Sequence, residues 1–171
     1  MNNIIKQYMF FSFIIITLQL IMFNNVNFLG FINPWIYIIL IIIIPASIKE
    51  NYLIIISFLM GLLLDSLFST SGINTISLIS TAWLRNYLLK KIFSGKNYDK
   101  KKFISIKNNG FNLYLKYVTI IVFIHHGILI LVDYVNFVKI SEIMIKTILS
   151  SIVSIVIIMC FSFVNTVNQN D

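Results

Sequence analysis

One aspartate lies inside a long apolar stretch and is the strongest candidate for a residue with a chemical task. Asp65 follows Gly61 with three leucines between them, and Gly72 comes seven residues after Asp65. The surrounding stretch, residues 52–68, is long enough to cross a bilayer. A carboxylate at membrane depth is costly, so it usually has a partner or a function. The candidate roles are a proton or ion site, a polar contact between helices, and a helix end reached by water.

Small polar residues and one arginine form a stripe along the next apolar segment. Asn74, Ser77, Thr81 and Arg85 recur every three or four residues, which places them within about 80° of one another on a helix. Such residues let membrane helices approach closely and form hydrogen bonds. Asn74 and Ser77 should lie at the depth of Asp65. Arg85 lies toward the other end, where we expect it to extend to the membrane interface rather than form a buried ion pair.

Two histidines lie in the middle of a further apolar segment. Asp133 follows His126 by seven residues, on the same helical face. Histidine and carboxylate together are typical of proton relays and metal sites. However, His125 and His126 diverge by about 100° on a helix, zinc needs three or four ligands, and the chain has no other histidine. We therefore expect interhelical hydrogen bonds here, with no catalytic residue, cofactor or metal.

The composition makes the membrane the solvent for most of the chain. Of its 171 residues, 58% are hydrophobic and 11% are charged, whereas soluble domains carry about 25% charged residues. The fold class is therefore predicted to be all-α, as a polytopic membrane helical bundle that forms a single domain over residues 1–171. About six segments are long enough to be spans: residues 4–23, 31–48, 52–68, 73–92, 113–135 and 140–164.

Prolines and short connections arrange the second, third and fourth segments. Pro34 should lie in the first turn of the second span, where its missing N–H costs nothing. Pro45 should end that helix. The connections at 46–51 and 69–72 are short, so these three spans are predicted to be antiparallel neighbours.

The lysines are unevenly distributed, and this predicts the orientation. They lie in the N-terminus, in the turn after the second span, and in or beside the connection 93–112, whereas the opposite connections offer only Lys139. With six spans the lysine-rich parts share one side, and such connections stay in the cytoplasm. We therefore expect both termini and the basic loop 93–112 to be cytoplasmic. Anionic lipid headgroups are the expected partners of this loop, rather than nucleic acid.

Between residues 31 and 90 the turn and helix residues follow one ordered pattern. Two prolines bound a span, and a Gly-x-x-x-Asp span and a further glycine follow: Pro34, Pro45, Gly61, Asp65 and Gly72. This pattern resembles that of the MreD family of rod shape-determining membrane proteins, whose length and span number also fit.

The resemblance implies a non-enzymatic scaffold in the bacterial inner membrane. MreD proteins work beside MreC, the actin-like MreB and the peptidoglycan synthases, so MreC is the implied partner and the link to MreB. The MreD fold is similar to the substrate-binding subunits of energy-coupling-factor transporters. A subunit that binds a small, vitamin-like molecule for transport is therefore the alternative. A scaffold should copurify with MreC, whereas a transporter subunit should retain its ligand.

On the scaffold interpretation, the candidate residues bind partners or hold helices together. They are Gly61, Asp65, Gly72, Asn74, Ser77, Arg85, His125, His126 and Asp133. We expect Asp65 to be the most sensitive polar position, with donors from Asn74 and Ser77 at its depth. Because an amide can still form hydrogen bonds, the sequence predicts a mild effect of Asp65→Asn and a larger effect of Asp65→Leu.

Overall fold

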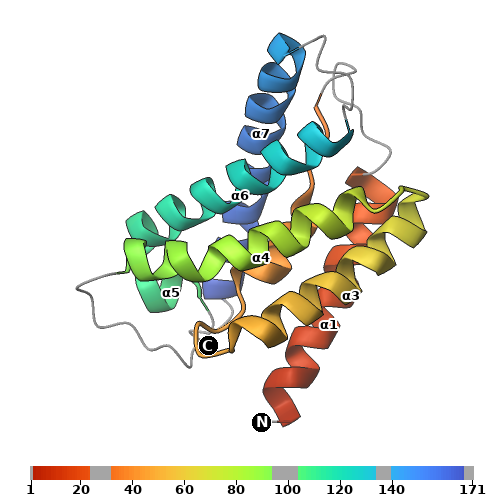
Figure 1. The fold of residues 1–171 in the computed structure, drawn as a ribbon. Coiled ribbons are helices and arrows are strands. Elements are labelled where there is room, and N and C mark those ends of the chain that lie inside the picture. The colour runs from red at the N-terminus through yellow and green to blue at the C-terminus, as the bar shows by residue number, and fades with distance from the viewer. Residues whose placement is uncertain (1, 24–31, 94–103, 134–139, 168–171) are drawn as a thin grey trace.

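The computed structural model of the chain describes residues 2–23, 32–93, 104–133 and 140–167 (Figure 1). Every regular element in these ranges is a helix, which confirms the predicted all-α class. In chain order the elements are α1 (Asn2–Leu18), the π-helix η1 (Gln19–Phe23), the 3-10 helix η2 (Ile36–Ile38), α2 (Ile39–Ile42), α3 (Glu50–Phe68), α4 (Ile73–Ile92), α5 (Ile106–Asn109), α6 (Phe111–Asp133) and α7 (Ile140–Val167).

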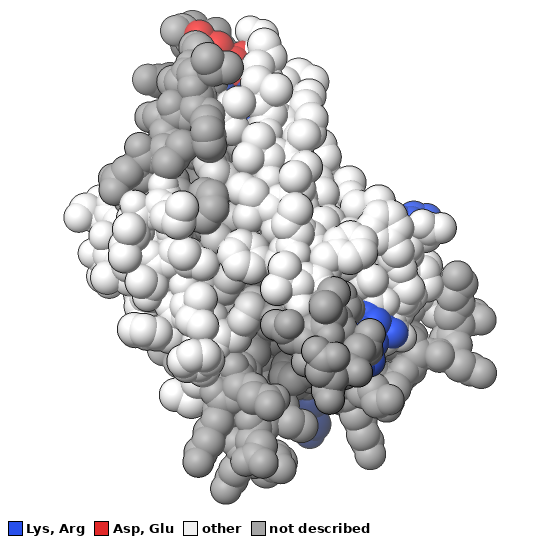
Figure 2. Space-filling view, turned by 180° about the vertical axis from the view of Figure 1, so that it is seen from behind, with Lys and Arg blue, Asp and Glu red and all other residues white. Residues whose placement is uncertain are grey.

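Three of the described helices are long and apolar enough to cross a membrane. They are α3, α6 and the part of α7 over Ile140–Val164. Their outward faces carry large apolar side chains, for example Leu59 at 59% exposure and Val156 at 57%. Figure 2 shows a broad uncharged surface, with carboxylates at one edge and lysines at others. Such a surface suits lipid rather than water. The structure therefore supports membrane association with three candidate spans, where the sequence predicted six.

The expected second span, residues 31–48, is not a membrane-crossing helix. Only Ile36–Ile42 is helical, which corresponds to a length of about 10 Å. Each residue of that segment is at most 1% exposed, so it forms the centre of the bundle. The apolar run led to the wrong prediction because composition alone does not distinguish a buried inner segment from a lipid-facing one.

The two prolines bound this inner segment, although Pro34 does so differently from the prediction. Pro34 lies before the first helical residue, Ile36, and its carbonyl accepts a hydrogen bond from Gln19 Nε2 at 3.1 Å. Gln19 Oε1 in turn accepts from the backbone N–H of Ile36 at 2.8 Å. The helix ends at Ile42, three residues before Pro45, as the second proline predicted.

Helices α3 and α4 form the predicted antiparallel hairpin (Figure 1). The turn between them needs two left-handed residues, Ser69 with φ 56° and Gly72 with φ 88°. Glycine adopts this conformation without the steric cost that a Cβ brings. The backbone N–H of Thr70 closes the turn by donating to the Asp65 carbonyl at 3.0 Å.

Gly61 sets how closely the two helices of the hairpin approach. A Cβ at this position would lie 2.4 Å from the Cα of Thr75 and 2.9 Å from its Oγ1. Small residues at such crossings are what allow helices in membranes to pack. Gly61 therefore fixes the register of α3 against α4.

The second half of the molecule continues the packing in chain order. Helix α4 packs against α6, and α6 packs against α7. The described part of the expected basic loop contains α5, whose N-cap residue Ser105 accepts from the backbone N–H of Asn108 at 3.3 Å. Gly110, with φ 78°, separates α5 from α6. Residues 94–103 lie outside the described ranges.

We predict that Gly61→Ala destabilises the bundle by about 1–3 kcal/mol, because the new methyl group would push the Thr75 backbone away. Gly127→Ala is the matched control. A Cβ there would meet Thr147 Cγ2 at 3.9 Å, an ordinary contact. Denaturant unfolding in detergent micelles, followed by circular dichroism, measures both. Equal stability of the two variants would contradict the close approach.

Candidate functional site

Asp65 is the centre of a group of hydrogen bonds at the α3–α4 turn. Its Oδ1 accepts from the backbone N–H and the Nδ2 of Asn74, both at 3.0 Å, and from Thr70 Oγ1 at 2.5 Å. Its Oδ2 accepts from the backbone N–H of Thr75 at 2.9 Å and from Thr75 Oγ1 at 2.5 Å. Asp65 is only 6% exposed, so these donors take the place of water.

This arrangement makes Asp65 the N-terminal cap of a helix other than its own. The first N–H groups of a helix have no partner within it, and a side-chain oxygen usually satisfies one of them. The N-cap position of α4 is Gly72, which makes no side-chain cap bond. Asp65 reaches across from α3 instead and accepts from the N–H groups of Asn74 and Thr75. Its negative charge also suits the positive end of the α4 dipole.

The geometry favours a structural role for Asp65 over an ion site. A carboxylate has about four lone-pair positions, and Asp65 accepts from five protein donors. The predicted donor Asn74 is confirmed, but Ser77 is not a donor to Asp65 because its hydroxyl donates to the Ile73 carbonyl at 2.8 Å. Thr70 and Thr75 donate instead. Sequence reasoning missed them, although hydroxyl residues at a turn and at a helix start are the usual signal for capping.

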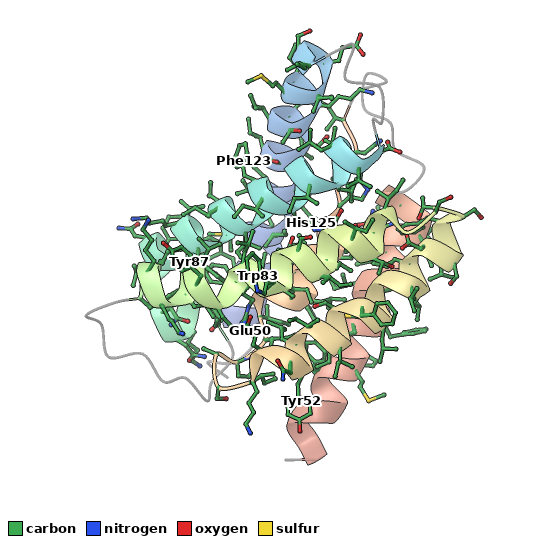
Figure 3. All side chains as sticks on the ribbon, viewed as in Figure 1. Glu50, Tyr52, Trp83, Tyr87, Phe123 and His125 are labelled. Carbon is green, nitrogen blue, oxygen red and sulfur yellow. The ribbon has the colours of Figure 1, made fainter. Side chains whose placement is uncertain are left out.

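A chain of hydrogen bonds continues from this cap into the core. Asn74 Oδ1 accepts from the Tyr37 hydroxyl at 2.6 Å, and the same hydroxyl lies 3.1 Å from His125 Nε2. The Tyr37 and His125 rings meet edge to face with centroids 5.3 Å apart. Figure 3 shows His125 on α6, where that helix passes α4. Three separate parts of the chain, α4, η2 and α6, are thereby joined.

The directions of these bonds assign the protonation of His125. Asn74 Nδ2 donates to Asp65, so the Asn74 amide oxygen is the atom that accepts from Tyr37. The single hydroxyl proton of Tyr37 is then used, and its oxygen accepts from His125. These directions favour a proton on Nε2 of His125, although the ring also contacts the Ser77 backbone. Its Nδ1 lies 3.4 Å from Thr81 Oγ1, which itself donates to the Ser77 carbonyl at 2.6 Å.

His126 makes different contacts from its neighbour. Its Nδ1 lies 3.0 Å from the Val122 carbonyl, which can only accept, so the proton is on Nδ1. Its Nε2 accepts from Ser154 Oγ on α7 at 2.9 Å. The Trp35 and His126 rings meet edge to face, with centroids 5.0 Å apart. The predicted interhelical hydrogen bonds of the histidines are therefore confirmed.

Of the two remaining candidates, Arg85 lies elsewhere than predicted. Asp133 is exposed at the end of α6, about 10 Å along the helix from His126, so the two side chains are not in direct contact. Arg85 is 0% exposed and does not extend to the interface. Within the described ranges, no three His, Cys, Asp or Glu side chains come together as a metal site.

Arg85 is buried because the end of α2 needs donors. Its Nη2 donates to the Ile44 carbonyl, and its Nε donates to the Tyr117 hydroxyl at 2.8 Å. Tyr117 donates onward to the Ile42 carbonyl at 3.3 Å. Ile42 is the last residue of α2 and Ile44 follows it, so these carbonyls lack the partners that a longer helix would give them. Arg85 Nη1 has no hydrogen-bond partner among the described residues.

The predicted site residues thus do not form one site. Ser77 bonds within α4 and His126 bonds to Ser154 on α7. Gly61, Asp65, Gly72 and Asn74 meet at the α3–α4 turn, and the hydrogen bonds of Asn74 link them to His125. Arg85 holds the end of α2, while Asp133 stands apart. No protein-family model, curated protein or solved structure matches this chain. Its function is therefore inferred from its residues and their contacts.

The geometry revises the expected outcome for Asp65→Asn. Each Asp65 oxygen accepts from a backbone N–H, so the amide nitrogen of asparagine would face a donor wherever it pointed. We predict that Asp65→Asn and Asp65→Leu both cost about 1–3 kcal/mol, since each leaves buried donors unsatisfied. Hydrogen exchange should rise at the Asn74 or the Thr75 amide in Asp65→Asn, and at both amides in Asp65→Leu.

The matched control for these variants is Ser66→Ala. Ser66 is the next residue, it is exposed, and its hydroxyl bonds only to the Leu63 carbonyl of its own helix. The control should unfold like the unaltered protein. Unaltered stability of Asp65→Asn would show that the cap does not need both carboxylate oxygens.

We predict opposite tautomers for the two histidines, with the proton on Nε2 in His125 and on Nδ1 in His126. Because the chain has only these histidines, ¹⁵N-histidine labelling gives two imidazole spin systems that nuclear magnetic resonance can assign. Tyr37→Phe removes the hydroxyl partner of His125, so it should shift the His125 nitrogens more than those of His126. The same tautomer in both rings would refute the assigned bond directions.

Proposed function

We propose that the chain is a non-enzymatic membrane scaffold of the MreD type, with both termini cytoplasmic. It binds MreC in the bacterial inner membrane and so helps to position MreB and the peptidoglycan synthases for lateral wall growth. The proposal rests on one observation: the residues that resemble the family pattern have a structural role in this chain. Gly61, Asp65 and Gly72 together fix the shape of one helical hairpin.

A rigid hairpin supports a scaffold because it presents fixed faces to other membrane proteins. The Asp65 cap and the close contact at Gly61 hold α3 against α4. The outward sides of these helices then expose large side chains, such as Leu62 at 47%, Ile76 at 47% and Trp83 at 60%. Aromatic residues such as Trp83 are enriched at the centres of protein interfaces. The polar groups stay inside, and the apolar faces are free for partner helices.

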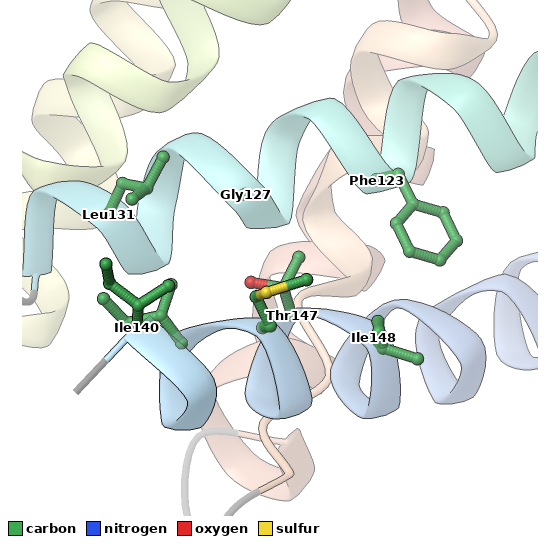
Figure 4. A pocket seen from close by; sticks show the side chains of 8 residues that line it. Phe123, Gly127, Leu131, Ile140, Thr147 and Ile148 are labelled. Atoms are coloured by element: carbon green, nitrogen blue, oxygen red, sulfur yellow. The ribbon is translucent and has the colours of Figure 1, made fainter.

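The alternative of a transporter subunit has weaker support. A pocket of about 290 Å³ lies between α6 and α7 (Figure 4). Its lining is apolar except for the Thr147 hydroxyl: Phe123, Gly127, Leu131, Ile140, Ile143, Met144, Thr147 and Ile148. A vitamin-sized ligand needs several polar contacts to fix its orientation. Asp65, Asn74 and the two histidines do not line this pocket.

Copurification tests the proposed function. The tagged chain is expressed with the MreC protein of the same genome, extracted in mild detergent, and isolated through its tag. We expect MreC to be recovered with the unaltered chain and with Ser66→Ala, and to be reduced at least about threefold with Asp65→Leu, which loosens the hairpin. In a rod-shaped host depleted of its own MreD, the same variants should rank alike in restoring shape.

Native mass spectrometry of the same preparation tests the alternative. A scaffold should show bound MreC, whereas a transporter subunit should retain a small molecule at one copy per chain. Recovery of a small ligand without MreC would refute the scaffold and favour the transporter subunit.

A further inference from the structure

Arg85 is the only arginine of the chain, since every other member of its thirteen lysines and arginines is lysine. Lysine carries a compact point charge, whereas the planar guanidinium presents five N–H donors in a fixed fork that matches phosphate and carboxylate groups. The single fork of this lysine-rich chain is fully buried. We infer that position 85 needs the several N–H donors of a guanidinium, which the lysine ammonium does not present in the same geometry.

The contacts of Arg85 use only part of that pattern. The Tyr117 hydroxyl and the Ile44 carbonyl, which accept from Nε and Nη2, are both neutral. The two N–H groups on Nη1 meet no acceptor among the described residues. A buried cation is unfavourable unless an anion compensates for the lost water.

No carboxylate in the described ranges forms an ion pair or a hydrogen bond with Arg85. Asp65 caps α4, and Glu50 is exposed at the start of α3. Asp133 is exposed at the end of α6, and Glu142 lies in the first turn of α7. Within the described part of the chain, Arg85 is thus a cation with a free pair of donors and no counter-ion.

The hairpin register places Arg85 level with the first residues of α3, a candidate membrane span. Gly61 lies against Thr75, and the helices are antiparallel, so the first residue of α3, Glu50, lies level with Arg85 and its neighbour Asn86. Tyr52, Trp83 and Tyr87 surround this level and are 62%, 60% and 63% exposed (Figure 3). Exposed tyrosine and tryptophan mark the headgroup layer of a bilayer, where phosphate groups are concentrated.

We propose that Arg85 binds an oxyanion, a phosphate or carboxylate group, through Nη1 at this membrane surface. The backbone beside the guanidinium, residues 43–49, is a non-helical connection in which Ser47 and Lys49 are exposed. Because Arg85 is fully buried, binding requires an outward shift of the groups that cover Nη1. Lys49 and Lys90, both exposed near the same level, raise the local concentration of anions.

The oxyanion has two possible sources, a phospholipid headgroup and a soluble anion, and the single arginine lets one experiment distinguish them. The full chain, labelled with ¹⁵N-arginine, is placed in zwitterionic phosphatidylcholine nanodiscs, where it gives one guanidinium Nε signal. One sample is titrated with inorganic phosphate, and in another, phosphatidylglycerol replaces part of the phosphatidylcholine.

We expect the signal to shift saturably, with one anion bound per chain. A shift with phosphate identifies a soluble anion, and a shift with phosphatidylglycerol alone identifies a headgroup. Lys90→Gln is the control and should leave the shift in place. Because Arg85→Lys keeps the charge but loses the fork, binding measured by native mass spectrometry should fall at least about tenfold.

A guanidinium signal that neither anion moves would overturn the site. An equal loss of binding in Lys90→Gln would also overturn it, because the surface lysines would then be the binding groups. The proposal does not rest on the scaffold function. Its test needs no MreC, so a failed copurification leaves it standing.

Discussion

The hydrogen bonds of one carboxylate determine how the rest of this bundle is arranged. Asp65 belongs to α3 but satisfies the first N–H groups of α4. In a membrane an unsatisfied N–H is especially costly because no water is available to replace the partner. The cap therefore fixes where α4 begins, and the glycine contact one turn earlier fixes how near it lies. Every later contact of α4, with Tyr37 and with His125 among others, depends on that position.

A second consequence follows from the polarity of the cap. A carboxylate only accepts hydrogen bonds, so each group bonded to it must donate. The next group in the chain of bonds must in turn donate to that group. This order passes from Asp65 through Asn74 and Tyr37 to His125. Such networks specify one arrangement of the core more strictly than apolar packing does, since a reversed bond leaves two donors or two acceptors facing each other.

Sequence patterns located the hairpin correctly, because its signals are local. The polar stripe, Gly61, Asp65 and the short turn lie within about 25 residues of one another, and the capping rules operate over that range. The structure of the segment after Pro34 depends instead on contacts with distant helices, such as the hydrogen bond from the Tyr117 hydroxyl to the Ile42 carbonyl. The burial of Arg85 has the same cause, since the Ile44 carbonyl to which it donates follows the short helix α2. The hydropathy of a segment does not predict which distant helices will contact it.

The short inner helix also has a consequence for how the protein is made. Residues 36–42 are enclosed on all sides, and some of their partners come late in the chain: His125 lies 88 residues after Tyr37. At synthesis rates of about 5–20 residues per second, roughly 4–18 s separate the two. During that interval an apolar segment too short to span the bilayer has to remain next to the emerging helices without its final contacts. Biogenesis therefore sets a minimum time before the core closes, and the second half of the chain completes the folding of the first.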